Sequence, residues 1–151
     1  MMRLKIPPVV ILFLSLGIIF GMSYAFPAWV YKFEYQTLLS RIILAMGVLA
    51  ALSGILSFRM KGTTVDPTKP DKASSLVTAG IYKYTRNPMY LGMALILFGG
   101  IIRIGNPSTI LGLVFFVWYL THYQIKPEEE ALSELFGKEY EEFCSKVRRW
   151  L

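Results

Sequence analysis

The chain has 151 residues, of which 54% are hydrophobic and only 17% are charged. Soluble domains are nearer about 45–50% apolar and about 25% charged, so the composition indicates a bilayer environment and excludes a disordered or collagen-like chain. The chain has one cysteine, Cys144, and one histidine, His122. An internal disulfide is therefore excluded, and we expect neither a metal site nor a Ser–His or Cys–His catalytic pair.

Four stretches of the chain carry no charged residue, and they hold 26, 17, 16 and 22 residues. A helix that crosses the hydrocarbon core needs about 20 apolar residues, with a range of roughly 17–25. The pattern predicts an all-α, polytopic integral membrane protein with four transmembrane helices, of which the second and third are short. We place these spans at Pro8–Phe26, Leu39–Phe58, Pro88–Ile102 and Pro107–Tyr123.

The cations are distributed unevenly around these spans. Thirteen of the 16 Lys and Arg residues lie before the first span, between the second and third, or after the fourth. Only Lys32, Arg41 and Arg103 lie on the other side. By the positive-inside rule we expect both termini to be cytoplasmic, in the inner or plasma membrane of a prokaryote. The net charge of +6 is then a topology signal, and we expect no nucleic-acid partner.

The rest of the chain is organised around one face of the membrane. Three features resemble a cleavable signal peptide: Met1–Lys5, the apolar run Val9–Phe20 and Ser23-Tyr24-Ala25. Further spans follow, so an uncleaved first helix is expected. We expect a single domain over residues 1–151, with a cytosolic loop at 59–87 and a cytosolic tail at 124–151. These two segments carry nearly all the polar residues that chemistry would need.

The loop begins with irregular backbone rich in Gly and Pro and ends in a polar cluster before the third span. Asn87-Pro88 predicts a helix start, with Asn as N-cap and Pro at the first helical position, and Asn106-Pro107 repeats this pattern. Capping explains Asn87 and Pro88. Capping accounts less well for the presence of four neighbouring residues, Tyr82, Tyr84, Arg86 and Tyr90. Tyrosines are, however, also common at membrane interfaces.

The tail predicts an amphipathic helix that begins at Pro127. Its apolar stripe, at about 100° per residue, contains Ala131, Leu132, Leu135, Phe136, Tyr140, Phe143, Cys144 and Val147. Glu130, Glu134 and Glu141 lie on the opposite face, whereas Glu129 falls within the stripe and Glu128 at its edge. Carboxylates favour the first turn of a helix, but one that points at the apolar side needs a partner or ligand.

Two motifs together resemble the isoprenylcysteine carboxyl methyltransferase family and the related phospholipid N-methyltransferases. The first is Gly80-x-Tyr82-x-x-x-Arg86-Asn87-Pro88-x-Tyr90-x-Gly92; the second is Glu128-Glu129-x-x-Leu132-x-x-x-Phe136-Gly137-x-x-Tyr140, followed by Val147-x-Arg149. The resemblance covers roughly Leu38–Leu151. Many members have His in place of Asn87 and Tyr in place of Phe143, and the eukaryotic members are longer.

The resemblance implies a membrane-embedded methyltransferase that binds S-adenosylmethionine on its cytosolic side. It implies that Arg86 and Glu129 act in catalysis, with Arg86 on the cofactor carboxylate and Glu128 or Glu129 on its ammonium or ribose hydroxyls. Tyrosine faces would steady the sulfonium, and the backbone of residues 76–80 would bind adenine. The implied cofactor-binding residues are Leu76, Val77, Thr78, Gly80, Tyr82, Arg86, Asn87, Pro88, Tyr90, Gly92, His122, Tyr123, Glu128 and Glu129.

The acceptor implied is a lipophilic molecule, an isoprenylcysteine-like carboxylate or a phospholipid amine, that enters from the bilayer between helices. His122 and Tyr123 would line this meeting point. Two other interpretations remain open: a sterol-reductase-like enzyme that uses NADPH, and a non-catalytic membrane adaptor with a basic cytosolic face. Glu129 favours an enzyme over an adaptor, because an adaptor needs no inward-facing acid. The sequence leaves open the acceptor atom, the base and the oligomeric state.

Overall fold

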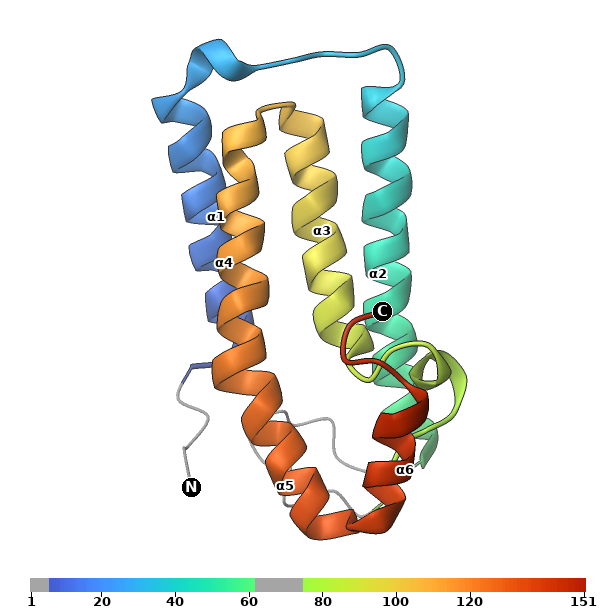
Figure 1. The fold of residues 1–151 in the computed structure, drawn as a ribbon. Coiled ribbons are helices and arrows are strands. Elements are labelled where there is room, and N and C mark those ends of the chain that lie inside the picture. Colours follow the sequence, from blue (N-terminus) through green and yellow to red (C-terminus); the bar gives the residue numbers. More distant parts are fainter. Residues whose placement is uncertain (1–5, 62–74) are drawn as a thin grey trace.

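The computed structural model describes residues 6–61 and 75–151, and every regular element in these ranges is a helix. The α-helices are α1 (Pro8–Ala25), α2 (Gln36–Lys61), α3 (Pro88–Ile104), α4 (Ile110–Leu120), α5 (Lys126–Phe136) and α6 (Lys138–Lys146). Helices α1 to α4 form an elongated bundle, and α5 and α6 extend beyond one end of it (Figure 1). The prediction of an all-α, polytopic membrane protein is confirmed.

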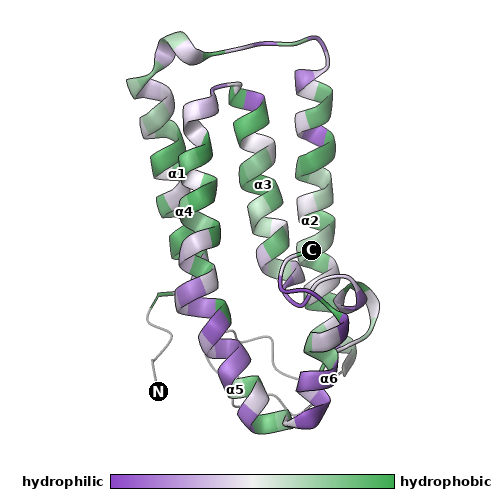
Figure 2. Ribbon diagram, viewed as in Figure 1, coloured by the Kyte–Doolittle hydropathy of each residue, from purple (hydrophilic) through white to green (hydrophobic). Residues whose placement is uncertain are grey.

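Three helical stretches are long and apolar enough to cross a membrane: Pro8–Ala25, Gln36–Met60 and Pro107–Phe136. The third of these contains α4 and α5. Helix α3 is apolar but shorter, with 17 residues, the lower limit for a span. Both α2 and α3 run past their predicted ends, because charged residues such as Arg59 and Arg103 near helix ends do not interrupt backbone hydrogen bonding. Apolar residues dominate α1 to α4, whereas α5 and α6 are largely hydrophilic (Figure 2).

Helices α2 and α3 make the closest contact in the bundle, because glycines let their backbones approach. A Cβ atom added at Gly92 would lie 2.5 Å from the carbonyl oxygen of Gly47 and 2.8 Å from the Cβ atom of Ala51. The hydroxyl of Ser40 also donates to the carbonyl of Gly99 at 2.8 Å. This contact fixes α3, whose N-terminal end carries the polar cluster predicted from the sequence.

The two predicted Asn-Pro helix starts differ in the structure. Asn106 is an N-cap, as predicted, since its side chain accepts a hydrogen bond from the backbone N–H of Ser108 at 3.1 Å. With Pro88 at the first helical position, Asn87 occupies the N-cap position of α3, as predicted. Its side chain makes no cap hydrogen bond and instead donates to the carbonyl of Arg149 at 2.9 Å. The C-terminal segment thus supplies an acceptor that the local sequence does not reveal.

The tail differs from the single amphipathic helix that the sequence predicts. Helix α4 continues through a π-helical turn, η5 (Thr121–Ile125), directly into α5, so the fourth predicted span has no break at Tyr123. The tail then divides into α5 and α6 at Gly137, whose φ of +51° ends the helix. Leu135, which belongs to the predicted apolar stripe, is 45% exposed.

Candidate active site

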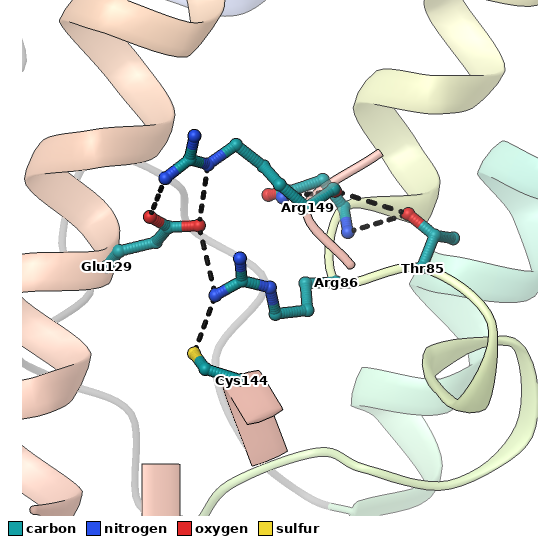
Figure 3. Close-up of polar contacts among 6 residues, drawn as sticks. Thr85, Arg86, Glu129, Cys144 and Arg149 are labelled. Atoms are coloured by element: carbon teal, nitrogen blue, oxygen red, sulfur yellow. Dashed lines mark hydrogen bonds and ion pairs between the residues drawn. The ribbon is translucent and has the colours of Figure 1, made fainter. Parts of the chain in front are cut away.

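The polar residues of both motifs meet where α3 begins, at the end of the bundle. Four segments come together there: the 3-10 helix η3 (Gly80–Lys83) with the residues that follow it, helix α5, helix α6 and the C-terminal segment 147–151. Figure 3 shows side chains from these segments pointing toward one another around Glu129. Of the predicted loop, the structure describes residues 59–61 and 75–87, and the Gly- and Pro-rich portion between them lies outside the described residues.

Glu129 is held by two guanidinium groups. Arg149 binds it in a bidentate manner, with Nε 2.9 Å from Oε1 and Nη2 2.7 Å from Oε2. Arg86 Nη1 lies 3.2 Å from Glu129 Oε1 and donates to Cys144 Sγ at 2.6 Å (Figure 3). The hydrogen bonds that Arg149 donates to the Glu129 carboxylate raise the pKa of Arg149. Two cations around one carboxylate leave a net positive charge, which suits an anionic ligand group.

The C-terminal segment is fixed across this site by its backbone and by Trp150. The backbone N–H of Arg86 donates to the carbonyl of Arg148 at 3.0 Å. The indole Nε1 of Trp150 donates to Thr121 Oγ1 at 3.2 Å. These contacts place the Arg149 side chain on Glu129. In the sequence, the motif Val147-x-Arg149 is the only signal for Arg149, and it indicates no role for the residue.

Glu128 and Glu129 are consecutive on a helix, so their side chains point about 100° apart. Glu128 turns away from the arginines and accepts a hydrogen bond from the hydroxyl of Tyr90 at 2.6 Å. Gln124 also donates to Glu128 through Nε2. Tyr90 and Gln124 are 4% and 1% exposed, so this polar group lies at the end of the apolar core. Gln124 belongs to neither motif, so the sequence does not indicate this role for it.

A second apolar cluster supports the site from the end of the bundle that carries α6. Its buried members are Leu76, Val77, Tyr82, Tyr140, Phe143 and Val147. Burial raises the pKa of Tyr82, and the nearby Glu128 carboxylate raises it further. Burial also raises the pKa of Tyr140. Both phenols therefore stay neutral. The cluster explains how the irregular backbone around residues 76–80 is anchored beneath α6.

Several of the predicted cofactor-binding residues lie elsewhere. Gly92 faces α2, where helix packing accounts for it. Pro88 is buried as the first residue of α3, and Thr78 borders a separate cleft beside Phe143. His122 and Tyr123 are exposed, and the ring atom Nδ1 of His122 lies 2.8 Å from the carbonyl oxygen of Trp118. Neither of these last two residues lines the cleft that borders Arg86 and Glu129.

The comparison with known families decides how this arrangement is classified. The family model for phospholipid methyltransferase matches residues 35–139, which is more than half of the chain. The chain belongs to the phospholipid methyltransferase family. The family comprises membrane methyltransferases that use S-adenosylmethionine. The match includes α2, α3, α4 and α5, and therefore both Arg86 and Glu129.

Individual relatives of this family member agree with that classification. The chain is 34% identical over 80 residues to protein-S-isoprenylcysteine O-methyltransferase of Saccharomyces cerevisiae, covering 53% of this chain and 34% of the yeast protein. It is 27% identical over 124 residues to the Schizosaccharomyces pombe enzyme of that name, covering 81% and 52%. An uncharacterized protein of Haemophilus influenzae is 41% identical over 63 residues, 42% of this chain and 100% of that protein.

The chain thus spans about a third to a half of these yeast relatives. No solved structure matches it significantly.

Two features of this phospholipid methyltransferase family member fit the amino-acid head of S-adenosylmethionine. The first is an open cleft of about 330 Å³, within the usual range of about 300–1,000 Å³ for small-molecule sites. It is lined by Arg86, Lys126, Glu129, Glu130, Ser133, Tyr140, Glu141, Cys144 and Arg149. The second is Arg86 Nε, which is buried and has no hydrogen-bond partner within the described residues. A ligand carboxylate would satisfy this donor.

Proposed function

We propose that this protein transfers a methyl group from S-adenosylmethionine to a lipophilic acceptor. The observation that carries the proposal is the Arg86–Glu129–Arg149 group, which borders the cleft and includes an unsatisfied guanidinium donor. An amino-acid head carries one carboxylate and one ammonium. The arginines offer donors to the carboxylate, and Glu129 offers an acceptor to the ammonium. A non-catalytic adaptor has no need for this mixed-charge group in a cleft.

The chemistry requires alignment more than acid–base groups. When bound, S-adenosylmethionine supplies an electrophilic methyl carbon on a sulfonium sulfur, and displacement at that carbon is in line. Arg86 and Arg149 would both donate to the carboxylate of the amino-acid head and so orient the cofactor. The apolar cluster that contains Tyr82 and Tyr140 excludes water from beneath the cleft. These residues would therefore position the cofactor and keep water away from it. Both effects accelerate such a displacement.

The acceptor reaches the site from the bilayer side in this proposal. The cleft lies at the end of four apolar helices, and the outward faces of α1 and α2 are rich in large exposed hydrophobic residues. An apolar tail prefers lipid, so its reactive head would arrive near the N-terminal end of α3. Both classes of acceptor implied by the resemblance, a carboxylate and an amine, are compatible with this route.

Purified protein in detergent is expected to bind S-adenosylmethionine and its demethylated product but not NADPH. Titration calorimetry with each compound measures this directly. The Arg86–Glu129–Arg149 group matches an amino-acid zwitterion, whereas NADPH brings phosphates and no ammonium group. Binding of NADPH without S-adenosylmethionine would refute the proposed function and favour the sterol-reductase-like interpretation.

The orientation in the membrane is a further part of the proposal. Lys83 and Arg86 precede α3, whereas Arg103 lies in its last turn, so these cations mark opposite ends of the bundle. We expect the end with α5 and α6 to face the cytoplasm. In a Cys144→Ser background, an impermeant thiol reagent added to intact cells should label Lys32→Cys and not Lys83→Cys. The reverse labelling pattern would contradict a cytosolic site.

A further inference from the structure

We propose that residues 26–35 form an anchor in the membrane interface, where the segment binds phospholipid at the boundary between headgroups and acyl chains. The segment joins α1 to α2 at the end of the bundle opposite α5 and α6 (Figure 1). It contains a 3-10 helix, η1 (Pro27–Trp29), followed by irregular backbone. This end of the molecule is remote from the candidate active site, so the inference does not depend on methyl transfer.

The segment is rich in aromatic side chains, and all of them are exposed. Five of its ten residues are aromatic, against 15% of the whole chain. Trp29, Tyr31 and Phe33 are 51%, 69% and 51% exposed, and Phe26 and Tyr35 are 39% and 65% exposed. Aromatic rings that carry a polar N–H or O–H group prefer the interface between lipid and water. The composition therefore fits this boundary better than it fits bulk water.

The charged residues around these rings match the phosphates of lipid headgroups. Within the described residues, three exposed cations and one exposed acid lie at this end: Lys32, Arg41, Arg103 and Glu34. Long basic side chains near the end of a span extend their charge to the headgroups while their carbon chains stay among apolar groups. The excess of cations favours an anionic group, which phospholipids supply as phosphate. The rings and the charges thus fit the same partner.

Helix α3 is too short to reach both surfaces of a bilayer. Its 17 residues, at about 1.5 Å each, span about 25 Å, whereas the hydrocarbon core is about 30 Å thick. Lys83 and Arg86 precede α3 and belong to the opposite headgroup layer, so its last turn ends about 5 Å inside the hydrocarbon boundary. The backbone N–H of Tyr31 donates to the carbonyl of Gly105, directly after α3, at 2.8 Å. Residues 26–35 therefore cover the layer that α3 does not reach.

The backbone carbonyls at this end are paired as a lipid environment requires. The last carbonyls of a helix have no partner within the helix. Gln36, which is 4% exposed, donates to the carbonyls of Ile102 at 2.8 Å and Arg103 at 3.2 Å. Asn106, which is 1% exposed, donates to the carbonyl of Phe26 at 2.7 Å. Water would satisfy such carbonyls in an exposed loop, whereas in the bilayer they need partners within the protein.

Spin labels on single cysteines measure the depth of the segment in phosphatidylcholine vesicles. The full chain carries Cys144→Ser, and collisions of the label with oxygen and with a water-soluble nickel chelate report the depth. We expect the label at Phe33→Cys to lie about 5–10 Å below the phosphates. Glu134→Cys is the reference for water, because Glu134 is exposed on the hydrophilic helix α5. Leu49→Cys is the reference for hydrocarbon, because Leu49 is 63% exposed midway along α2.

Replacing Trp29 and Tyr35 together by Ser tests whether the rings hold the segment at this depth. The Phe33→Cys label should then move outward to the phosphates or beyond, a shift of about 5–10 Å. Tyr84→Ser is the control, because Tyr84 is 74% exposed at the opposite end of the bundle, and it should leave the depth unchanged. An unchanged depth in the double variant would overturn the anchor.

Two results for the Phe33→Cys label alone would also overturn the inference. Nickel collisions as frequent as those at Glu134→Cys would place the segment in water. A label that neither oxygen nor nickel reaches would show that a second copy of the chain or another protein covers the segment in place of lipid. Neither result bears on the binding of S-adenosylmethionine, so the proposed function is tested separately.

Discussion

Replacing Glu129 by Gln is expected to weaken the binding of S-adenosylmethionine about ten- to a hundredfold, measured by calorimetry in detergent. A charge-assisted hydrogen bond to a ligand is worth roughly 1.5–3 kcal/mol, and each 1.4 kcal/mol is about a factor of ten in affinity. Glu129 is also the only acid within ion-pair distance of Arg86 and Arg149 among the described residues. Its loss therefore removes the acceptor for the ligand ammonium and releases both guanidinium groups.

The neighbouring acids on α5 provide the comparison for this prediction. Glu130 and Glu134 are exposed, and Glu130 lies at the rim of the cleft. Glu130→Gln removes a charge from the same helical turn, so a purely helix-dipole role predicts similar losses of about 0.3–1 kcal/mol at both positions. We expect Glu130→Gln and Glu134→Gln to change affinity less than twofold. Equal effects of Glu129→Gln and Glu130→Gln would refute the site assignment and leave the fold unaffected.

Replacing Gly92 by Ala is expected to destabilise the protein by about 1–3 kcal/mol, the usual range for overpacking, or more. The added methyl group would lie 2.5 Å from the Gly47 carbonyl oxygen and 2.8 Å from the backbone nitrogen of Ala51. Both are backbone atoms of α2, so the contact can be relieved only by separating α2 from α3. A thermal melt in detergent, followed by circular dichroism, measures the loss.

Gly100, eight residues later on α3, is the matched control. A Cβ atom added there would meet nothing within 4 Å among the described residues. Gly100→Ala should therefore leave the melting temperature unchanged or raise it, because Ala is the better helix former. If Gly92→Ala melts like Gly100→Ala, the close contact between α2 and α3 is wrong. In that case Gly92 would again be a candidate for the cofactor role that the resemblance implies.

The sequence alone predicted the features that depend on local chemistry. The thickness of the hydrocarbon core fixes how long an uncharged stretch must be, so the helices containing Pro8, Pro88 and Pro107 could be located from charge spacing. Helical phase placed Glu130, Glu134 and Glu141 on the exposed face and turned Glu129 inward. Pairing of the two motifs identified Arg86 with Glu129, and the structure places them 3.2 Å apart.

Only the tertiary structure decided the features that depend on contacts between distant segments. The π-turn at Thr121–Ile125, which the sequence does not predict, holds Gln124 buried and His122 exposed. Local propensity predicts that the Asn87 side chain caps α3. Instead, its amide donates a hydrogen bond to the carbonyl of Arg149, 62 residues away in sequence. The partners of Glu128 and Glu129 differ for the same reason. A helix sets the direction of each side chain, whereas the chain segments that fold against it determine whether that side chain meets a cation or a neutral donor.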